Sequence, residues 1–468
     1  MASGDDKLTV NKGLELSFAD PVSSLKVEDV QVSEVPQHDA ESSTADPDLA
    51  GTISSEPNIR RRIGLLTMVA LCFNICSSWA GLSTSIQIAL LQGGPVTLIY
   101  GTILITAIYL CISLLIAELG SVYPTAGGQY HFTSILAPER MTRSLSYACG
   151  FITVFQWVSS GAAVMVITAT QIMALVGYFN PGAQGEAWQL FLIYQVIGVL
   201  ALFCNLFILN KLPIMHTIGF ILSIAIFLAT FIGILSRASP MATHEFVWTT
   251  FINQTGWSDG VCFLTGLITP AFMYGGLDGA LHLSEEARNP RKIVPRACVG
   301  VIIVGFCTAF PFGIALLYSI SDFQAIIGSS GFVPFEINAQ GLRSGDAAAA
   351  LLCAGCVLGF FILNALLQSS SRLVWSFARD DGFAFSHIIR RVHSVLNVPL
   401  WATFLNWLLL ALCGFLILAS PIDYTPVVLG IVGILGLINW VVYARRHFKG
   451  PRIQLEDRPV SGIEVRVE

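Results

Sequence analysis

Two polar interruptions in otherwise apolar segments are the places where this chain could carry out chemistry. Residues 77–83 (SSWAGLS) form the first, and residues 274–279 (YGGLDG) form the second. Glycine weakens a helix by about 1 kcal/mol per residue, so three glycines close to Asp278 predict unwound backbone. The alternative is that such small residues only let helices pack closely, as we expect of Gly355 and Gly359.

Unwound backbone inside a helix offers hydrogen-bonding groups to a ligand. The free N–H groups at the start of a half-helix attract anions, and we expect them near residues 82–85 and at Ala280. Free carbonyl groups at the opposite ends suit an ammonium group. Trp79, Phe272 and Tyr274 could add cation–π attraction, although aromatic residues more often only pack. An amino acid or a related amine fits such a site.

The elements that hold these interruptions are predicted to be membrane-spanning helices. The chain is 54% hydrophobic and 12% charged, whereas a soluble domain averages about 25% charged residues. A membrane helix needs about 20 apolar residues to cross roughly 30 Å of hydrocarbon. The composition therefore predicts an all-α, polytopic membrane protein. Ten stretches are long and apolar enough to span the membrane: 63–91, 96–117, 145–177, 187–209, 212–235, 260–288, 297–320, 346–371, 399–419 and 425–443.

Asp278 lies inside the sixth of these spans. An ionised carboxylate at the centre of a membrane helix costs about 2.5 to 3.5 kcal/mol on insertion scales, so an acid there is expected to have a function. Asp278 would either take up a proton during a reaction cycle or order the broken backbone. The alternative is a buried acid that only accepts hydrogen bonds from neighbouring amide groups.

The distribution of basic residues predicts the orientation. Lysine and arginine beside membrane helices tend to remain in the cytoplasm. With the N-terminus inside, eighteen of them flank the cytoplasmic ends and only Arg237 and Arg343 flank the outer ends. Both termini are therefore predicted to be cytoplasmic, and the sequon at Asn253 would lie outside as a glycosylation candidate.

The rest of the sequence predicts few other kinds of site. Residues 1–58 are too polar to bury a core and are expected to be a disordered cytoplasmic tail, with a second cytoplasmic tail at 449–468. The eleven cysteines lie in or beside apolar runs. We expect them to pack, and the spacing of Cys353 and Cys356 alone does not predict a metal site.

Neither nucleic-acid binding nor enzyme chemistry is expected. The net charge is −5, and the basic residues follow membrane side rather than forming a patch. The spans contain no HExxH motif and no nucleophile with a plausible base, since His216 and His282 are isolated. We expect no cofactor, with a proton as the coupling ion.

Several motifs resemble those of a known family. They are SSWAGLS from Ser77, LLQGGP from Leu90, AELGSVYPTAGGQY from Ala117, HLSEEARNPRKIVPRA from His282, SRLVWSFARDDG from Ser371 and WVVYARRHFKGP from Trp440. From about residue 60 to 420 the chain resembles the amino acid/polyamine/organocation permeases, and within them the fungal amino acid/choline transporters, which are similar to GABA and choline permeases. This resemblance implies a leucine-transporter-type core of five plus five helices in inverted repeats, alternating access and usually proton coupling.

Within the transmembrane domain, expected at 59–448, the first repeat would cover about 63–235 and the second about 260–443. By position, the resemblance assigns substrate contacts to seven residues of the two interruptions: Ser78, Ala80, Gly81, Leu82, Gly275, Gly276 and Asp278. Trp79 and Tyr274, named above for their aromatic rings, complete the predicted substrate site. Gating or coupling is expected of six residues: Glu118, Asp278, Glu285, Glu286, Arg372 and Arg379. Glu285 and Glu286 would belong to the inner gate, answered by Arg372 or Arg379.

Two features depart from the family pattern. Members usually have twelve spans, whereas this chain has ten, and two helices are missing after 419–420. The last segment either replaces the tenth helix of the core or leaves the second repeat without its closing helix. In addition, the fifth span has no lysine or arginine at mid-depth, only His216 near its cytoplasmic start, so the coupling ion stays open.

The sequence therefore predicts an integral, multi-pass secondary transporter of the plasma membrane. It would carry an amino acid, γ-aminobutyrate, choline or a similar amine, driven by protons, with alternating access around the first and sixth helices. The alternative is a membrane sensor with impaired transport, or a truncated permease without function, that kept the fold.

Overall fold

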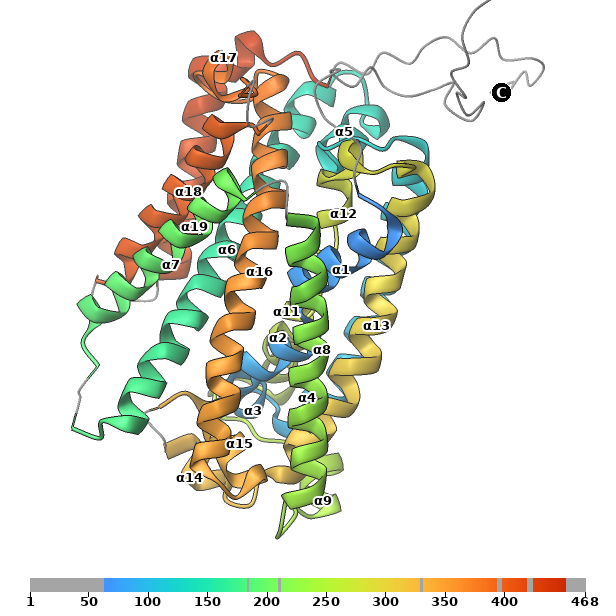
Figure 1. Cartoon of the computed structure of the whole chain (residues 1–468). Helices are drawn as coiled ribbons and strands as arrows, with labels where there is room; N and C mark the ends of the chain where they lie inside the picture. Colours follow the sequence, from blue (N-terminus) through green and yellow to red (C-terminus); the bar gives the residue numbers. More distant parts are fainter. Residues whose placement is uncertain are drawn as a thin grey trace, which may run out of the picture. The chain divides into compact units, whose positions relative to one another are not determined.

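The computed structural model describes residues 63–182, 185–208, 212–328, 331–393, 398–418 and 424–451, which form helices and connecting segments (Figure 1). The predicted tail at 1–58, most of the tail at 449–468 and the junction at 419–423 lie outside the described residues. Within the described part, eight helical segments are long and apolar enough to cross a membrane.

The first half of the chain contains nine helices: α1 (Leu65–Cys76), α2 (Ser78–Thr84), α3 (Ile86–Leu91), α4 (Gly94–Val122), α5 (Gln129–Leu136), α6 (Thr142–Phe179), α7 (Ala187–Phe207), α8 (Leu212–Arg237) and α9 (His244–Thr249). The second half contains α10 (Asp259–Gly266), α11 (Ile268–Phe272), α12 (Gly279–His282), η3 (Ser284–Glu286), α13 (Pro290–Ser319), α14 (Phe323–Gly328), α15 (Val333–Leu342), α16 (Gly345–Arg379), α17 (Ser386–Ile389), α18 (Leu400–Gly414), η4 (Phe415–Ile417), α19 (Tyr424–Asn439), η5 (Trp440–Ala444) and α20 (Arg445–His447).

Each of the ten predicted spans corresponds to helical structure. Eight are membrane-length segments, the first of them built from α1, α2 and α3 in succession. The other two are shorter: the sixth span is divided into α10, α11, α12 and η3, and the tenth is the 16-residue α19 followed by the π-helical η5. Several helices extend beyond their predicted ends, most of all α13, which begins at Pro290, and α16, which continues to Arg379.

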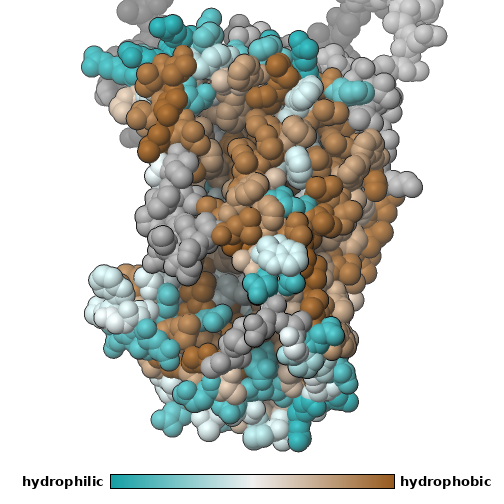
Figure 2. Space-filling view, turned by 90° about the vertical axis from the view of Figure 1, so that its left-hand side faces the viewer, coloured by the Kyte–Doolittle hydropathy of each residue, from teal (hydrophilic) through white to brown (hydrophobic). Residues whose placement is uncertain are grey.

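The outer surface is apolar in the middle and polar at both ends. Figure 2 shows hydrophobic side chains across the middle of one face and hydrophilic ones at its top and bottom. On α4, for example, Leu104, Ile108, Leu114 and Leu115 are exposed. A contiguous exposed apolar surface of this kind marks contact with lipid, which agrees with the predicted membrane protein.

The interrupted first span lies at the centre of the helix bundle. Of the 18 most apolar consecutive residues of this span, 72% are buried, and α1 packs against α8, α13 and α16. Around it α4 packs against α13 and α6 packs against α16. The second and seventh spans occupy the same place in the two predicted repeats, and they pack together. The third and eighth spans do the same.

Both ends of the first span are attached to the chain around the sixth. At the α5 end of the bundle, the N–H of Ile63 donates to the carbonyl of Glu286 (3.1 Å) and Ile63 accepts from Arg288 (3.0 Å). At the α15 end, the N–H of Gly93 donates to the carbonyl of Ile252 (2.7 Å). These bonds hold the two interruptions at the same depth.

Candidate functional site

The first interruption is confined to one residue. Ser77 adopts a left-handed conformation (φ 40°, ψ 51°) between α1 and α2. The helix resumes at Ser78, and Gly81 already donates to the Ser77 carbonyl (2.7 Å). The prediction of unwound backbone across 77–83, with free N–H groups near 82–85, is therefore wrong in extent. The small residues of this motif fit a helix because they allow close packing on the second interruption.

The second interruption is longer and follows the prediction. Residues 273–278 form turns between α11 and α12. Gly276 has φ +85°, and a Cβ at this position would lie 2.5 Å from Cγ2 of Ile75. Only glycine meets both the conformation and the space, so the Gly-Gly sequence explains why the helix breaks here.

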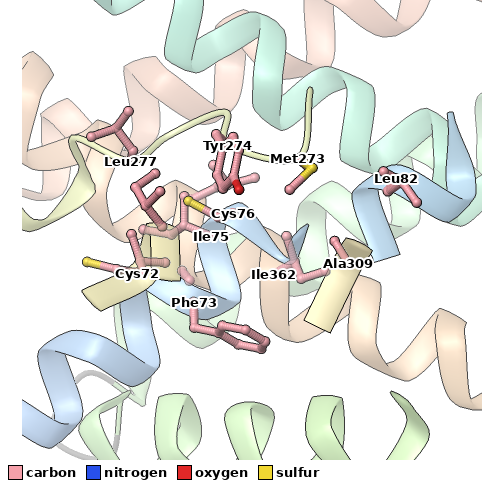
Figure 3. Packing of buried hydrophobic residues seen from close by; sticks show 14 of the residues in the cluster. Cys72, Phe73, Ile75, Cys76, Leu82, Met273, Tyr274, Leu277, Ala309 and Ile362 are labelled. Atoms are coloured by element: carbon pink, nitrogen blue, oxygen red, sulfur yellow. The ribbon is translucent and has the colours of Figure 1, made fainter. Parts of the chain in front are cut away.

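The two interruptions touch each other in the middle of the bundle. The Ser78 hydroxyl donates to the carbonyl of Met273 (2.9 Å). A Cβ on Gly81 would lie 3.5 Å from the Met273 Cα. Figure 3 shows the end of α1, with Ile75 and Cys76, close to Met273 and Tyr274 of the second interruption. The structure thus brings together the two motifs that the sequence identified.

A cavity of about 150 Å³ lies beside this contact. That volume is about ten times what a single water requires. Its wall contains five aromatic rings and no charged side chain among the described residues that line it; the rings are those of Trp79, Phe272, Phe312, Phe332 and Phe335. The cavity suits a small solute that gains from aromatic faces and neutral hydrogen-bonding groups.

The cavity extends from the interruptions toward the α15 end. On α6 it is lined from Ser160 to Gln171, a rise of roughly 16 Å at 1.5 Å per residue. Phe332, Phe335 and Asn338, from α15 and the residue before it, line its far part. A solute could therefore approach the interruptions from the α15 end of the bundle.

Three residues that line the cavity each have a buried side-chain oxygen without a hydrogen-bond partner within the described structure. These atoms are Oγ of Ser77, Oε1 of Gln171 and Oδ1 of Asn338. Ser77 is 4% exposed and Gln171 7% exposed. A buried unpaired polar group costs about 1–3 kcal/mol, so a side-chain rotation that let these oxygens accept from a solute would remove that cost. Gln171 and Asn338 were not predicted from the sequence: Gln171 is an amide in an otherwise apolar stretch of α6, and Asn338 lies among other polar residues of α15.

The predicted substrate residues divide into two groups. Trp79, Ala80, Gly81 and Gly275 line the cavity. The others lie behind its wall, where they serve the packing of the two interruptions: Ser78, Leu82, Tyr274, Gly276 and Asp278.

Two aromatic residues of the predicted site are anchored by hydrogen bonds. Nε1 of Trp79 donates to Oγ of Ser223 (2.9 Å), which fixes the ring that faces the cavity. The hydroxyl of Tyr274 pairs with Oγ1 of Thr106 (2.9 Å), which holds this ring behind the wall. Of the two, only Trp79 is placed to contact a solute.

Asp278 is buried in a polar network rather than exposed to the cavity. Its Oδ2 atom accepts from Nε2 of Gln129 (2.6 Å) and from Nε1 of Trp157 (3.3 Å). The same atom lies 3.2 Å from Nε2 of His282. Asp278 therefore ties the second interruption to α5 and α6 through side-chain donors, which matches the alternative of a buried acid that accepts hydrogen bonds, here including one from the Gln129 amide.

Two ion pairs close the bundle at the α5 end. Nε of Arg372 lies 2.7 Å from Oε1 of Glu286, and Nη2 of Arg379 lies 3.0 Å from Oε1 of Glu285. Glu285 also accepts from the N–H of Ala126 (3.3 Å). The structure thus pairs each predicted acid with one of the predicted arginines. We call these two pairs the ion-pair gate.

A second polar layer, absent from the sequence analysis, supports the ion-pair gate. Oδ2 of Asp380 accepts from the hydroxyl of Tyr130 (2.8 Å) and lies 3.0 Å from Nε2 of His131. Burial raises the pKa of Tyr130 well above its ordinary value, so this hydroxyl stays protonated as a donor. α5 is thereby fixed against the end of α16, next to Arg379.

Some predicted residues lie apart from these clusters. Glu118 is exposed on α4, outside the ion-pair gate. Asn253 is exposed on the loop between α9 and α10, and its amide donates to the carbonyl of Trp257 (2.7 Å). Cys353 is exposed on α16. Among the residues that could be searched, no group of three or more His, Cys, Asp or Glu could hold a metal ion.

Similarity to known proteins identifies the family to which this chain belongs. Residues 63–444 match the family model described as amino acid permease. The choline transporter of Saccharomyces cerevisiae is 30% identical over 402 residues, which are 85% of this chain and 71% of the relative. The amino-acid permease BAT1 of Arabidopsis thaliana is 27% identical over 371 residues, 75% of this chain and 71% of that protein.

The structure is also similar to a solved one. It is that of Mhp1, a nucleobase-cation-symport-1 family transporter in a closed conformation with bromovinylhydantoin bound. The TM-score is 0.47 at 10% identity, over 78% of this chain and 77% of the other. The family match covers most of the chain, and the predicted permease resemblance is confirmed. The chain belongs to the amino acid permease family, and it is a multi-pass membrane transporter rather than an enzyme.

Proposed function

We propose that this permease takes up a small amine-bearing solute by alternating access, driven by protons. One observation carries the proposal: the cavity at the two interruptions is lined by aromatic rings and neutral polar groups. No residue around it, in the part of the chain that the structure describes, supplies a charge. The solute would bind against Trp79 and the unpaired oxygens of Ser77, Gln171 and Asn338.

This lining favours an ammonium compound such as choline over a free amino acid. A cation over an aromatic face gains about 0.5–2 kcal/mol, and the carbonyl oxygens of Gln171 and Asn338 can accept from a hydroxyl or an amine. An α-carboxylate would have no lysine or arginine in the described wall to neutralise it. The name of the yeast relative, a choline transporter, supports the same choice.

The ion-pair gate would face the cytoplasm. Arginines and lysines gather at the α5 end, where the positive-inside rule places the cytoplasmic side. In this orientation both termini are cytoplasmic, the cavity extends toward the outside and the inner side is closed. The structure would then be an outward-directed form of a plasma-membrane carrier.

The proton gradient is sufficient for uptake. One elementary charge that moves through 100 mV gains about 2.3 kcal/mol. At 1.4 kcal/mol per factor of ten, this allows roughly fifty-fold accumulation. A proton would be the only ion required, and no cofactor is proposed.

Radiolabelled uptake into vesicles that contain the purified protein tests the function. Choline, γ-aminobutyrate and common amino acids are compared, each with and without an inward-directed pH gradient. We expect accumulation of choline that rises with the gradient. Saturable binding without accumulation of any of these solutes would contradict the proposal and indicate a sensor instead.

A further inference from the structure

His282 is a fully buried histidine whose two ring nitrogens both face oxygen atoms. It lies on α12, directly after the second interruption, and is 0% exposed. Nδ1 lies 2.8 Å from the carbonyl oxygen of Ala126, and Nε2 lies 3.2 Å from Oδ2 of Asp278. The edge of the Trp157 ring system covers the imidazole, with ring centroids 5.3 Å apart.

The hydrogen bonds of His282 and Asp278 determine how many protons the two side chains hold together. A carbonyl oxygen and a carboxylate only accept, and a neutral imidazole carries one N–H. Both contacts of His282 can be hydrogen bonds only if it carries a second proton or if Asp278 is protonated and donates to Nε2. Either way, His282 and Asp278 together hold one exchangeable proton and have no net charge.

The other partners of Asp278 favour the proton on His282. Nε1 of Trp157 can only donate, and it shares Oδ2 of Asp278 with the amide of Gln129. An oxygen that already accepts from two donors is best satisfied as part of an ionised carboxylate. The hydrogen-bond geometry therefore favours an imidazolium beside a carboxylate.

Among the described residues placed around Asp278, His282 is joined by no second cation. The titratable groups that interact electrostatically with Asp278 include Cys72 and Cys76 from α1, Tyr109 from α4 and Cys298 from α13. Gln129 of α5 and Trp157 of α6 are neutral, as is Ser369 of α16, which lies next to Gly279. None of these groups can be a cation. Removal of the proton would leave a buried unpaired charge, which costs several kcal/mol.

We propose that the His282–Asp278 pair carries the proton that couples to solute uptake, loaded while the ion-pair gate is closed. The link to the gate is Ala126. Its carbonyl accepts from His282, while its N–H donates to Glu285, which is paired with Arg379. This proposal rests on the proton-driven uptake proposed above.

The release step follows from that link. When the pair of Glu285 and Arg379 separates and the segment at Ala126 moves away, Nδ1 loses its acceptor and water reaches the pair. An N–H bond of the imidazolium then breaks, the electron pair stays on the nitrogen, and the proton passes to cytoplasmic water. Binding of the next proton from outside restores the neutral pair.

The test compares net accumulation with exchange in vesicles. In wild-type protein, a pH gradient of one unit allows up to about tenfold accumulation of choline. His282→Gln and Asp278→Asn are each expected to lower this ratio to about one, while exchange of internal for external choline continues. A purely structural role would reduce both readouts together. His216→Gln is the matched control, because His216 is also buried but its ring faces Gln368 (2.6 Å).

A wild-type measurement makes the test independent of variant folding. The reversal of choline flux against opposed solute and pH gradients gives the stoichiometry, and we expect one proton per choline because the pair holds one. A different ratio, or full gradient-driven accumulation by His282→Gln, would overturn the assignment to this pair. Wild-type uptake that ignores the pH gradient would instead contradict the coupling in the proposed function.

Discussion

The two interruptions occupy equivalent places in the predicted repeats but have different structures. The first consists of Ser77 alone, after which α2 continues as a helix. The second replaces the helix with a run of turns over residues 273–278. The first presents Trp79, Ala80 and Gly81 to the cavity, whereas most of the second lies behind the wall and leads to Asp278 and the ion-pair gate.

This difference indicates a division of tasks between two halves that look alike. A helix that continues after a single kink keeps its side chains in a fixed arrangement, which suits a solute site. A long unwound segment can change shape with little loss of helical hydrogen bonding, which suits a hinge that connects proton and gate. Four substitutions test this comparison, in order of decreasing effect.

Arg372→Gln should have the largest effect. It leaves Glu286, whose side chain is 17% exposed, without its partner, which costs up to about 3 kcal/mol, the low end of the range for a fully buried pair, and it should open the gate and reduce net uptake more than tenfold. Asp381→Asn is the matched control, because the pair of Asp381 and Arg390 is longer (3.7 Å) and more exposed and contributes at most about 1 kcal/mol. Equal uptake by both variants would show that the second interruption does not govern the gate.

Gly276→Ala should destabilise the unwound segment. Alanine would be held at φ +85° against Ile75, and strain of this kind costs about 1–3 kcal/mol. We expect a lower Tm in detergent and slower uptake. Gly300→Ala inside α13, where a Cβ meets nothing within 4 Å, should lower neither, because alanine favours a helix over glycine. A wild-type Tm for Gly276→Ala would contradict the hinge.

Trp79→Leu should weaken solute binding with little effect on the gate. Loss of the aromatic face removes up to about 2 kcal/mol of cation–π attraction, or roughly a thirty-fold rise in KM for choline. Trp79→Phe should recover part of this affinity. If Trp79→Leu lowered the maximal rate and left KM unchanged, the first interruption would not form the solute site.

Gln171→Leu should have the smallest and most selective effect. Loss of one hydrogen bond removes about 0.5–1.5 kcal/mol, which corresponds to an increase of about 2- to 12-fold in KM. Only solutes with a donor group, such as the choline hydroxyl, should be affected. Competition by tetramethylammonium, which has no donor, serves as the control, and an equal change for both ions would remove the role of Gln171.

The permease fold and much of the gate could be predicted from local sequence. Apolar runs of membrane length identify spans wherever lipid is the solvent, and all ten predicted stretches are helical. Gly275 and Gly276 identify the second break because the requirement for glycine is local. The family resemblance predicted that Arg372 or Arg379 pairs with Glu285 and Glu286, but only the structure showed which acid pairs with which arginine.

The sequence by itself determined the solvent of the chain, the places where its helices are interrupted and the charges of its gate, because composition and backbone preference act within a few residues. Only the tertiary structure decided that the first interruption stays helical, that Gln171 and Asn338 reach the cavity and that His282 meets both Asp278 and Ala126. Gln129 and Asp278, for example, are 149 residues apart in the chain. Such contacts depend on how whole helices pack, and no pattern of neighbouring residues encodes them.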